Sequence, residues 1–193
     1  MRDQSDLKGI LGRLDELRSE RDTSGKPSSL TVLLDLLEER VDQKERYVLL
    51  STLAREYALV GMISDAEQTL QRQASEFRGD ALPLISLAEH YLYVTSDYSK
   101  AAATIDRAIQ RAQRTGHFLR QAYNTRARIS RKLGDYVLLE DTILALIEYK
   151  PSTGAKDVRY EEDFLKGIPE GEVNPNVIET YRALVAASRA QPG

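Results

Sequence analysis

Few side chains in this sequence are suited to catalysis or to metal binding. The chain has no cysteine and only two histidines, His90 and His117, which lie 27 residues apart. The absence of cysteine excludes disulfides, thiolate metal ligands and cysteine nucleophiles. The two histidines lack the i, i+4 spacing with which one helix presents two ligands to a metal ion. The sequence therefore predicts no cofactor and no metal site.

Two further patterns resemble chemical motifs but lack the required partners. Gly25 and Lys26 followed by Ser28 share residue types with a phosphate-binding loop, but the first glycine of that motif is missing and Pro27 intervenes. The carboxylate run at residues 161–163 has no partners of defined geometry and is typical of a solvated face. We therefore expect that the protein is not an enzyme and has no small-molecule substrate.

The basic residues are unevenly distributed and suggest an acidic partner. Between residues 107 and 134 there are eight cations and no carboxylate, in a chain whose net charge is −3, which leaves −11 for the remainder. The eight are Arg107, Arg111, Arg114, Arg120, Arg126, Arg128, Arg131 and Lys132. Such segregation creates a local positive field that attracts negative charge. The alternative is a solvated basic face that only balances acidic neighbours.

Helices are expected to position these residues, because apolar residues recur with helical spacing along most of the chain. In the first segment the apolar stripe consists of Leu7, Ile10, Leu11, Leu14 and Leu17. A capping box at Ser64–Glu67 indicates that a helix begins three residues after Gly61. The predicted helices cover about 5–20, 30–41, 44–61, from 64 onward, 81–95, 98–114, 118–133, 136–149 and 175–189.

A helical hairpin recurs at intervals near 34 residues, with a longer interval of 39 between Ala88 and Ala127 of the third copy. Ala54 and Ala88 are 34 residues apart, and Ala66 and Ala101 are 35 apart. A period near 34 residues is the signature of a helical solenoid, in which hairpins stack on one another. The small residues lie where the two helices of a hairpin cross, since only short side chains allow a close approach.

This pattern resembles the tetratricopeptide repeat family over about residues 47–151. The first copy matches at Leu53, Ala54, Tyr57, Gly61, Ala66 and Leu70. The second copy, which has one inserted residue, matches at Leu87, Ala88, Tyr91, Asp97, Tyr98, Ala101, Ile105 and Ala108. The third matches at Tyr123, Ala127, Gly134, Asp135, Tyr136, Ile143 and Pro151, and departs at Arg126, Ser130 and Leu139.

The resemblance implies an all-α fold, a right-handed solenoid of antiparallel helix hairpins with N-terminal and C-terminal capping helices. Residues 1–43 would form a capping hairpin or a degenerate repeat, 44–151 the repeats, and 152–193 a C-terminal extension. In that family the first helix of each hairpin lines a concave groove that binds peptides. The corresponding positions are Ser51, Arg55, Ala58, Leu59, Ile85, Glu89, Leu92, Tyr93, Asn124, Arg128, Arg131 and Lys132.

These positions predict a partner-binding groove that is apolar at one end and cationic at the other. The partner-binding residues would be Arg55, Leu59, Glu89, Tyr93, Asn124, Arg128, Arg131 and Lys132. The amide of Asn124 would bond a peptide backbone, and guanidinium groups would hold a carboxylate. The acidic segment at residues 160–165, or the final helix, is a candidate internal occupant of the groove, because a linker before it is long enough to let it fold back.

The predicted function is a non-enzymatic adaptor that binds a peptide or a partner protein. Two alternatives stay open: nucleic-acid binding by the basic 107–132 region, and a structural homo-oligomer formed through the N-terminal helix or the open end of the repeat stack. The start of the chain shows no secretory signal and no apolar run is long enough to span a bilayer, so we expect a cytoplasmic protein.

Overall fold

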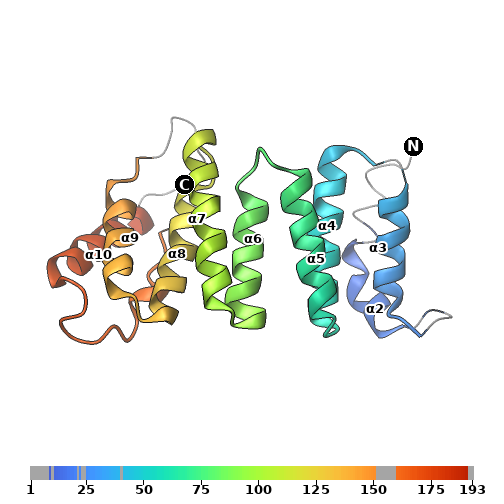
Figure 1. The fold of residues 1–193 in the computed structure, drawn as a ribbon, viewed down its shortest axis with the longest axis horizontal. Helices are drawn as coiled ribbons and strands as arrows, with labels where there is room; N and C mark the ends of the chain where they lie inside the picture. The colour runs from blue at the N-terminus through green and yellow to red at the C-terminus, as the bar shows by residue number, and fades with distance from the viewer. Residues whose placement is uncertain are drawn as a thin grey trace. The chain divides into compact units, whose positions relative to one another are not determined.

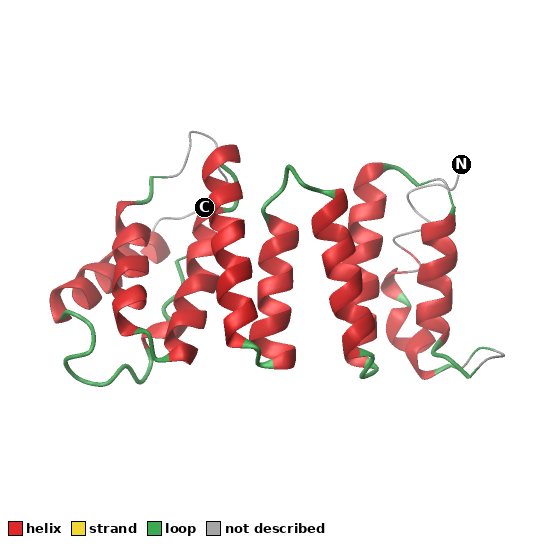
Figure 2. Ribbon diagram, viewed as in Figure 1, coloured by secondary structure: helices red, strands yellow, loops and turns green. Residues whose placement is uncertain are grey.

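The structure, a computed structural model, is all-helical. It describes residues 9, 11–20, 22, 25–39, 41–150 and 160–190, and none of these residues lies in a β-strand. Helices and the short loops that join them account for the described chain (Figure 2). The all-α part of the predicted fold is therefore confirmed.

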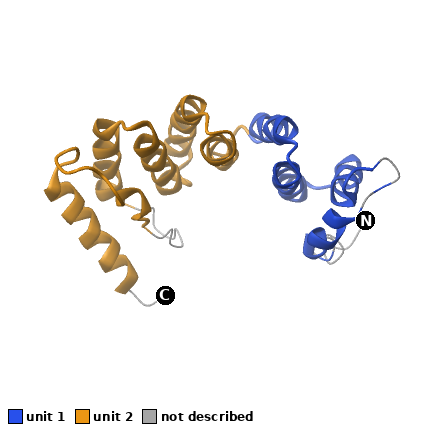
Figure 3. Ribbon diagram, turned by 90° about the horizontal axis from the view of Figure 1, so that it is seen from below, with its two compact units in different colours: residues 1–77 blue, residues 78–193 orange. Residues whose placement is uncertain are grey.

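The chain divides into two compact units, residues 1–77 and residues 78–193 (Figure 3). The domain boundaries expected from the sequence, near residues 43 and 151, fall inside these units. The predicted repeat region 44–151 therefore contributes to both.

Unit 1 contains four described helices that pack with their neighbours in sequence (Figure 1). They are α2 (Leu14–Ser19), α3 (Ser28–Glu38), α4 (Gln43–Leu59) and α5 (Ile63–Glu76). Their apolar faces form a leucine-rich core of Leu14, Leu30, Leu33, Leu36, Leu37, Leu49, Leu50 and Leu53. Burial of these faces stabilises the short helices, which would be marginal in isolation. Leu7 and Ile10, predicted for the first helix, lie outside the described residues.

The capping box predicted at Ser64 is wrong, and a capping box occurs instead at the start of α4. There the Asp42 side chain accepts from the Glu45 amide at 2.8 Å, and the Glu45 carboxylate accepts from the Asp42 amide at 3.1 Å. Helix α5 begins at Ile63, so Ser64 already lies inside it. The reason is that Gly61, in the left-handed region, closes α4 so tightly that the next helix begins within two residues.

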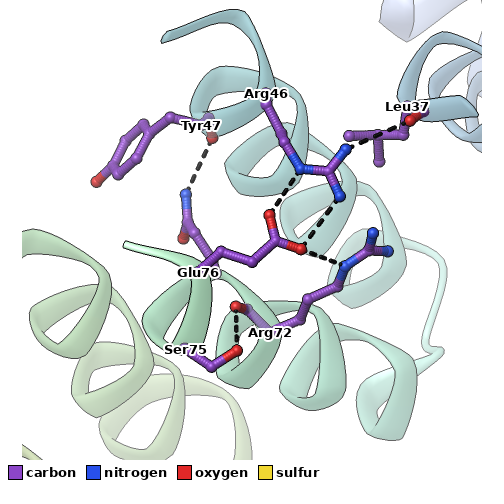
Figure 4. Close-up of polar contacts among 7 residues, drawn as sticks. Leu37, Arg46, Tyr47, Arg72, Ser75 and Glu76 are labelled. Atoms are coloured by element: carbon purple, nitrogen blue, oxygen red, sulfur yellow. Dashed lines mark hydrogen bonds and ion pairs between the residues drawn. The ribbon is translucent and has the colours of Figure 1, made fainter. Parts of the chain in front are cut away.

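Polar contacts join α3, α4 and α5 around Glu76 (Figure 4). Arg46 donates to both Glu76 carboxylate oxygens, at 2.6 and 3.1 Å, and also reaches the Leu37 carbonyl at 3.4 Å. Arg72 donates to the same carboxylate at 2.8 Å. Both guanidinium groups lower the pKa of Glu76, the Arg46 hydrogen bonds most. The bidentate pair adds a specific polar contact to the packing of α4 against α5, and the Leu37 carbonyl extends it to α3.

Unit 2 continues with helices that are again neighbours in sequence and in space (Figure 1). They are α6 (Leu82–His90), α7 (Tyr98–Thr115), α8 (Leu119–Leu133) and α9 (Tyr136–Glu148), followed by α10 (Pro175–Ala190). Helix α7 packs against both α6 and α8, and α6 also contacts α8. Ala88, Ala101 and Ala127 are fully buried in these packed helices, as expected for small residues that let helices approach closely.

Helix α6 ends differently from α4 and α8. The latter two end in glycines with positive φ, Gly61 and Gly134, each with the paired hydrogen bonds of a Schellman motif. Helix α6 instead widens into a π-helical turn, η1 (Tyr91–Thr95), and ends at Ser96, whose φ is 56°. The sequence expectation of one helix over 81–95 is therefore correct in extent but not in the type of its last turn.

The C-terminal extension folds back onto α8 and α9. A single 3-10 turn, η2 (Asp163–Leu165), lies against α8, and α10 packs against α9. Phe164, Val173, Tyr181 and Val185 from this extension are buried. The Tyr181 hydroxyl donates to the Glu161 carbonyl at 2.7 Å, which ties α10 to the segment before η2. The extension thus covers apolar surface that the last hairpin would otherwise expose.

Candidate functional site

A pocket of about 410 Å³ lies in unit 2, between the η1 end of α6, the C-terminal half of α8, and η2. Its lining residues are Leu92, Tyr93, Arg128, Arg131, Lys132, Asp163 and Phe164. Four of the eight residues predicted to bind a partner are among them. The volume falls in the range of about 300–1,000 Å³ that is typical of ligand sites.

Helical spacing places the cationic residues of this pocket together on α8. Positions 124, 128 and 132 are four residues apart and position 131 is three residues after 128, so all four lie on one side of the helix. The N-terminal end of that face is buried and the C-terminal end is open. Lys132 is exposed, whereas Arg128 and Arg131 are half-buried.

The three cations differ in how far their charge is compensated. Arg128 forms an ion pair with Glu161, in which both side chains are partly exposed. Arg131 donates a long hydrogen bond of 3.5 Å to the Phe164 carbonyl and packs against Gly167, but it forms no ion pair with a described carboxylate. Lys132 likewise has no ion-pair partner among the residues that the structure describes. The pocket therefore keeps an excess of positive charge at Arg131 and Lys132.

The opposite wall is apolar. Leu92 is almost fully buried beneath it, while Tyr93 is 58% exposed at the surface. Partial burial raises the pKa of the Tyr93 phenol, and the charges of Arg128, Glu89 and Asp163 also act on it. A side chain that combines an apolar part with a negative group would meet complementary surfaces here.

Glu89 lies behind this wall, on α6. Its carboxylate accepts a hydrogen bond from the Thr125 hydroxyl at 3.1 Å. Burial raises its pKa, although the Thr125 hydrogen bond and the charge of Arg128 act in the opposite direction. Glu89 therefore reduces the positive charge behind the pocket without being part of its lining.

Asn124 does not occupy the position expected from the sequence. It is only 1% exposed, it does not line the pocket, and neither polar atom of its amide has a hydrogen-bond partner among the described residues. Ile85, also expected to face a groove, is fully buried in the core of unit 2. Both residues lie on helices that pack against one another and against α7, so neither side chain is open to solvent.

Arg55 and Leu59 belong to unit 1 and are not part of this pocket. Leu59 is 53% exposed near the end of α4. Arg55 lines a second pocket of about 320 Å³, together with the ion pair between Arg18 and Glu56. These two residues lie in unit 1, so the candidate site in unit 2 does not include them.

The run of eight cations does not form one surface. Arg120 is buried, with its guanidinium over the rings of Tyr160 and Tyr149 at 4.3 and 5.1 Å. Arg126 donates to the Thr142 hydroxyl at 2.9 Å between α8 and α9. Arg111, on α7, donates to the Asp80 carbonyl at 3.0 Å. Only Arg128, Arg131 and Lys132 meet at the pocket.

The acidic segment contributes two lining residues, Asp163 and Phe164, that were not among the eight residues predicted to bind a partner. Tyr160 meets Arg120, Glu161 meets Arg128, and the Phe164 carbonyl meets Arg131, so residues 160–164 follow the direction of α8. The signal in the sequence was the acidic run beside two aromatic residues. In the structure this segment forms one wall, and the pocket beside it remains open.

The two histidines lie apart from this pocket. His90 is buried and packs edge-on against Tyr91, whereas His117 is exposed next to Phe118. Within the part of the chain that the structure describes, no group of three or more metal-ligating side chains lies together.

Comparison with known proteins yields no relative. No family model matches the sequence, and searches of curated proteins and of solved structures find no significant match. Among the described residues, no helix combines the length and the apolar character required to cross a membrane.

Proposed function

We propose that the protein is an interaction module, in which the pocket of unit 2 binds an acidic segment of a partner protein. The observation that carries this proposal is the placement of two cations without carboxylate partners among the described residues, Arg131 and Lys132, beside an exposed tyrosine in a pocket of about 410 Å³. The repeat spacing supports the proposal by analogy with helical-repeat proteins, since that scaffold serves many functions.

The chemistry of the pocket favours a peptide carboxylate as ligand. A lysine ammonium and an arginine guanidinium attract negative charge, and the attraction speeds association and selects against basic partners. Aromatic residues such as Tyr93 supply large contact area at low conformational cost. Asp163 at the rim pairs with Lys166 at 2.8 Å, so it adds little net repulsion to an incoming anion.

The experiment measures binding of a fluorescent synthetic peptide with four glutamates around one phenylalanine. We expect Lys132→Glu to weaken binding by about tenfold or more, because it replaces attraction by repulsion at an exposed position. Lys150→Glu is the matched control, since Lys150 is an exposed lysine of the same unit that does not line the pocket. The control should bind like the original protein.

Charge reversal at Arg128 is a poor test, because Arg128 pairs with Glu161 and its reversal would disturb the C-terminal segment. Equal binding by both lysine variants would contradict the proposal. So would stronger binding of a random single-stranded oligonucleotide than of the peptide, with the same loss in Lys132→Glu, because that result would indicate a nucleic-acid site.

A further inference from the structure

The end of α6 contains one residue more than the corresponding helices. From the buried repeat alanine to the first following residue with positive φ, the interval is seven residues in α4 (Ala54 to Gly61) and seven in α8 (Ala127 to Gly134). In α6 it is eight, from Ala88 to Ser96. The additional residue lies within η1, because a π-helical turn accommodates one more residue than an α-helical turn.

This insertion carries local costs. A π-helical turn has weaker hydrogen-bond geometry than an α-helix, and Ser96 adopts a left-handed conformation that glycine takes without strain. The two glycines at the equivalent positions show the arrangement without this cost. Strained turns of this kind persist where the surrounding structure requires them, and they are frequent at functional sites.

Local hydrogen bonds and packing hold the turn in place. The Thr95 hydroxyl donates to the Tyr91 carbonyl at 3.3 Å and accepts from the Asp97 amide at 3.3 Å. The Lys100 ammonium lies over the Tyr91 ring at 5.3 Å from its centre. Tyr91 and Leu92 thus stay buried, whereas the next two residues, Tyr93 and Val94, are exposed.

The turn directly borders the pocket, since Leu92 and Tyr93 form its apolar wall. The cationic wall comes from α8, and the third wall comes from Phe164 and Asp163 of η2. A ligand held by Lys132 and Arg131 would therefore place the neighbouring part of its chain against Tyr93. The apolar wall would distinguish between acidic peptides that carry the same charge.

We infer that the one-residue insertion in α6 is a specificity element, and that it selects partner segments in which an aromatic or large aliphatic side chain adjoins a carboxylate. The inference rests on the proposed function. It adds an apolar side chain to the carboxylate that the partner segment must carry. The protein's own segment shows the same combination, with Phe164 next to Asp163. That segment forms a wall of the site and does not fill it.

The test uses the full chain and two synthetic peptides that differ only in one residue, with phenylalanine or alanine among the same four glutamates. The quantity measured is the ratio of the two dissociation constants. For the original protein we expect the phenylalanine peptide to bind about tenfold more tightly, as is usual for an aromatic anchor. Lys132→Glu should weaken both peptides and leave the ratio largely unchanged.

Variants of the turn should change the ratio itself. Tyr93→Ala and deletion of Val94 are both expected to bring it close to one, whereas Tyr93→Phe should keep it. Tyr93 is mostly exposed, so Tyr93→Ala tests the inference even where the deletion fails to fold. Val137→Ala is the matched control, because Val137 is an apolar residue of the same unit that is 77% exposed and lies outside the pocket.

The outcomes separate the inference from the proposed function. A ratio that stays near tenfold in Tyr93→Ala overturns the inference, while a loss of affinity in Lys132→Glu in the same experiment leaves the proposed function standing. If the original protein binds neither peptide, both are overturned. A ratio that falls equally in Val137→Ala also overturns the inference, since the effect would then not belong to the turn.

Discussion

Arg131 and Lys132 are adjacent in sequence, but they contribute to the pocket in different ways. Arg131 is anchored, because it reaches the Phe164 carbonyl and packs beneath Gly167. Lys132 is exposed and makes no ion pair with a described residue. A substitution at Lys132 therefore reports on ligand charge, whereas one at Arg131 would also disturb the loop after η2. The choice of Lys132 for charge reversal follows from this difference.

Glu89 allows a prediction about pH at the residue scale. Since burial raises its pKa above the unfolded value of about 4.5, the folded chain binds the Glu89 proton more tightly than the unfolded chain does. In the pH range between the unfolded pKa of about 4.5 and the raised pKa of the folded chain, the contribution of Glu89 to the free energy of unfolding falls as the pH rises. We expect Glu89→Gln, which stays neutral, to be more stable than the original protein at pH 7 and equally stable at pH 4.

Urea denaturation at the two pH values measures this difference. Glu148→Gln serves as control, because Glu148 is an exposed carboxylate at the end of α9. Lower stability of Glu89→Gln at pH 7 would show that the Thr125 hydrogen bond and Arg128 outweigh burial.

At the scale of elements, α2 is held by its apolar contacts in the leucine core and by one ion pair with α4. The helix has six residues, too few for stability in isolation. Arg18 on α2 donates to both carboxylate oxygens of Glu56 on α4, at 2.8 and 2.6 Å, and the Glu56 side chain is only 2% exposed. Loss of Arg18 would leave a buried carboxylate without this partner.

We expect Arg18→Ala to lower the free energy of unfolding of unit 1 by about 3 kcal/mol, as is typical when one partner of a buried pair is removed. Arg13→Ala is the matched control. Arg13 directly precedes α2, but it pairs with Glu16 at 3.3 Å on the surface, and exposed pairs contribute at most about 1 kcal/mol. Chemical denaturation followed by circular dichroism compares the two. Equal effects would mean that the Glu56 pair adds no more than a surface pair.

The turns between helices show how one local change affects an element. Helices α4 and α8 remain α-helical up to a glycine with positive φ, whereas α6 ends in the π-helical turn η1 and Ser96. The inserted residue was visible in the sequence as a period of 35 instead of 34. Its conversion into a π-helical turn was not predictable, because an insertion can equally lengthen a loop.

For the whole molecule, the division into two units makes a separate prediction. All residues that line the proposed site lie in residues 78–193, and unit 1 has a leucine core of its own. We expect fragments 1–77 and 78–193, expressed separately, to keep helical circular dichroism. Only fragment 78–193 should bind the phenylalanine peptide, with an affinity close to that of the full chain. Loss of binding in a folded fragment 78–193 would indicate that residues of unit 1 take part.

The sequence by itself determined the helices, their approximate limits and the small residues at their crossings. These features are local, since they depend on hydrogen bonds four residues apart and on a period of 3.6 residues. Helices expected at 98–114, 118–133 and 136–149 differ from the observed ones by at most one residue at either end. The site was predictable only in part, because residues on one helix face share a direction but not the same surroundings.

Only the tertiary structure decided which of these residues form a site. It covers Asn124 and Ile85, separates Arg55 and Leu59 into another unit, and turns Arg120 and Arg126 toward neighbouring aromatic and hydroxyl groups. It also brings residues 160–164 against α8, about thirty positions earlier in the chain. Contacts at such separations depend on the sum of many weak packing interactions, and no local pattern in the sequence encodes that sum.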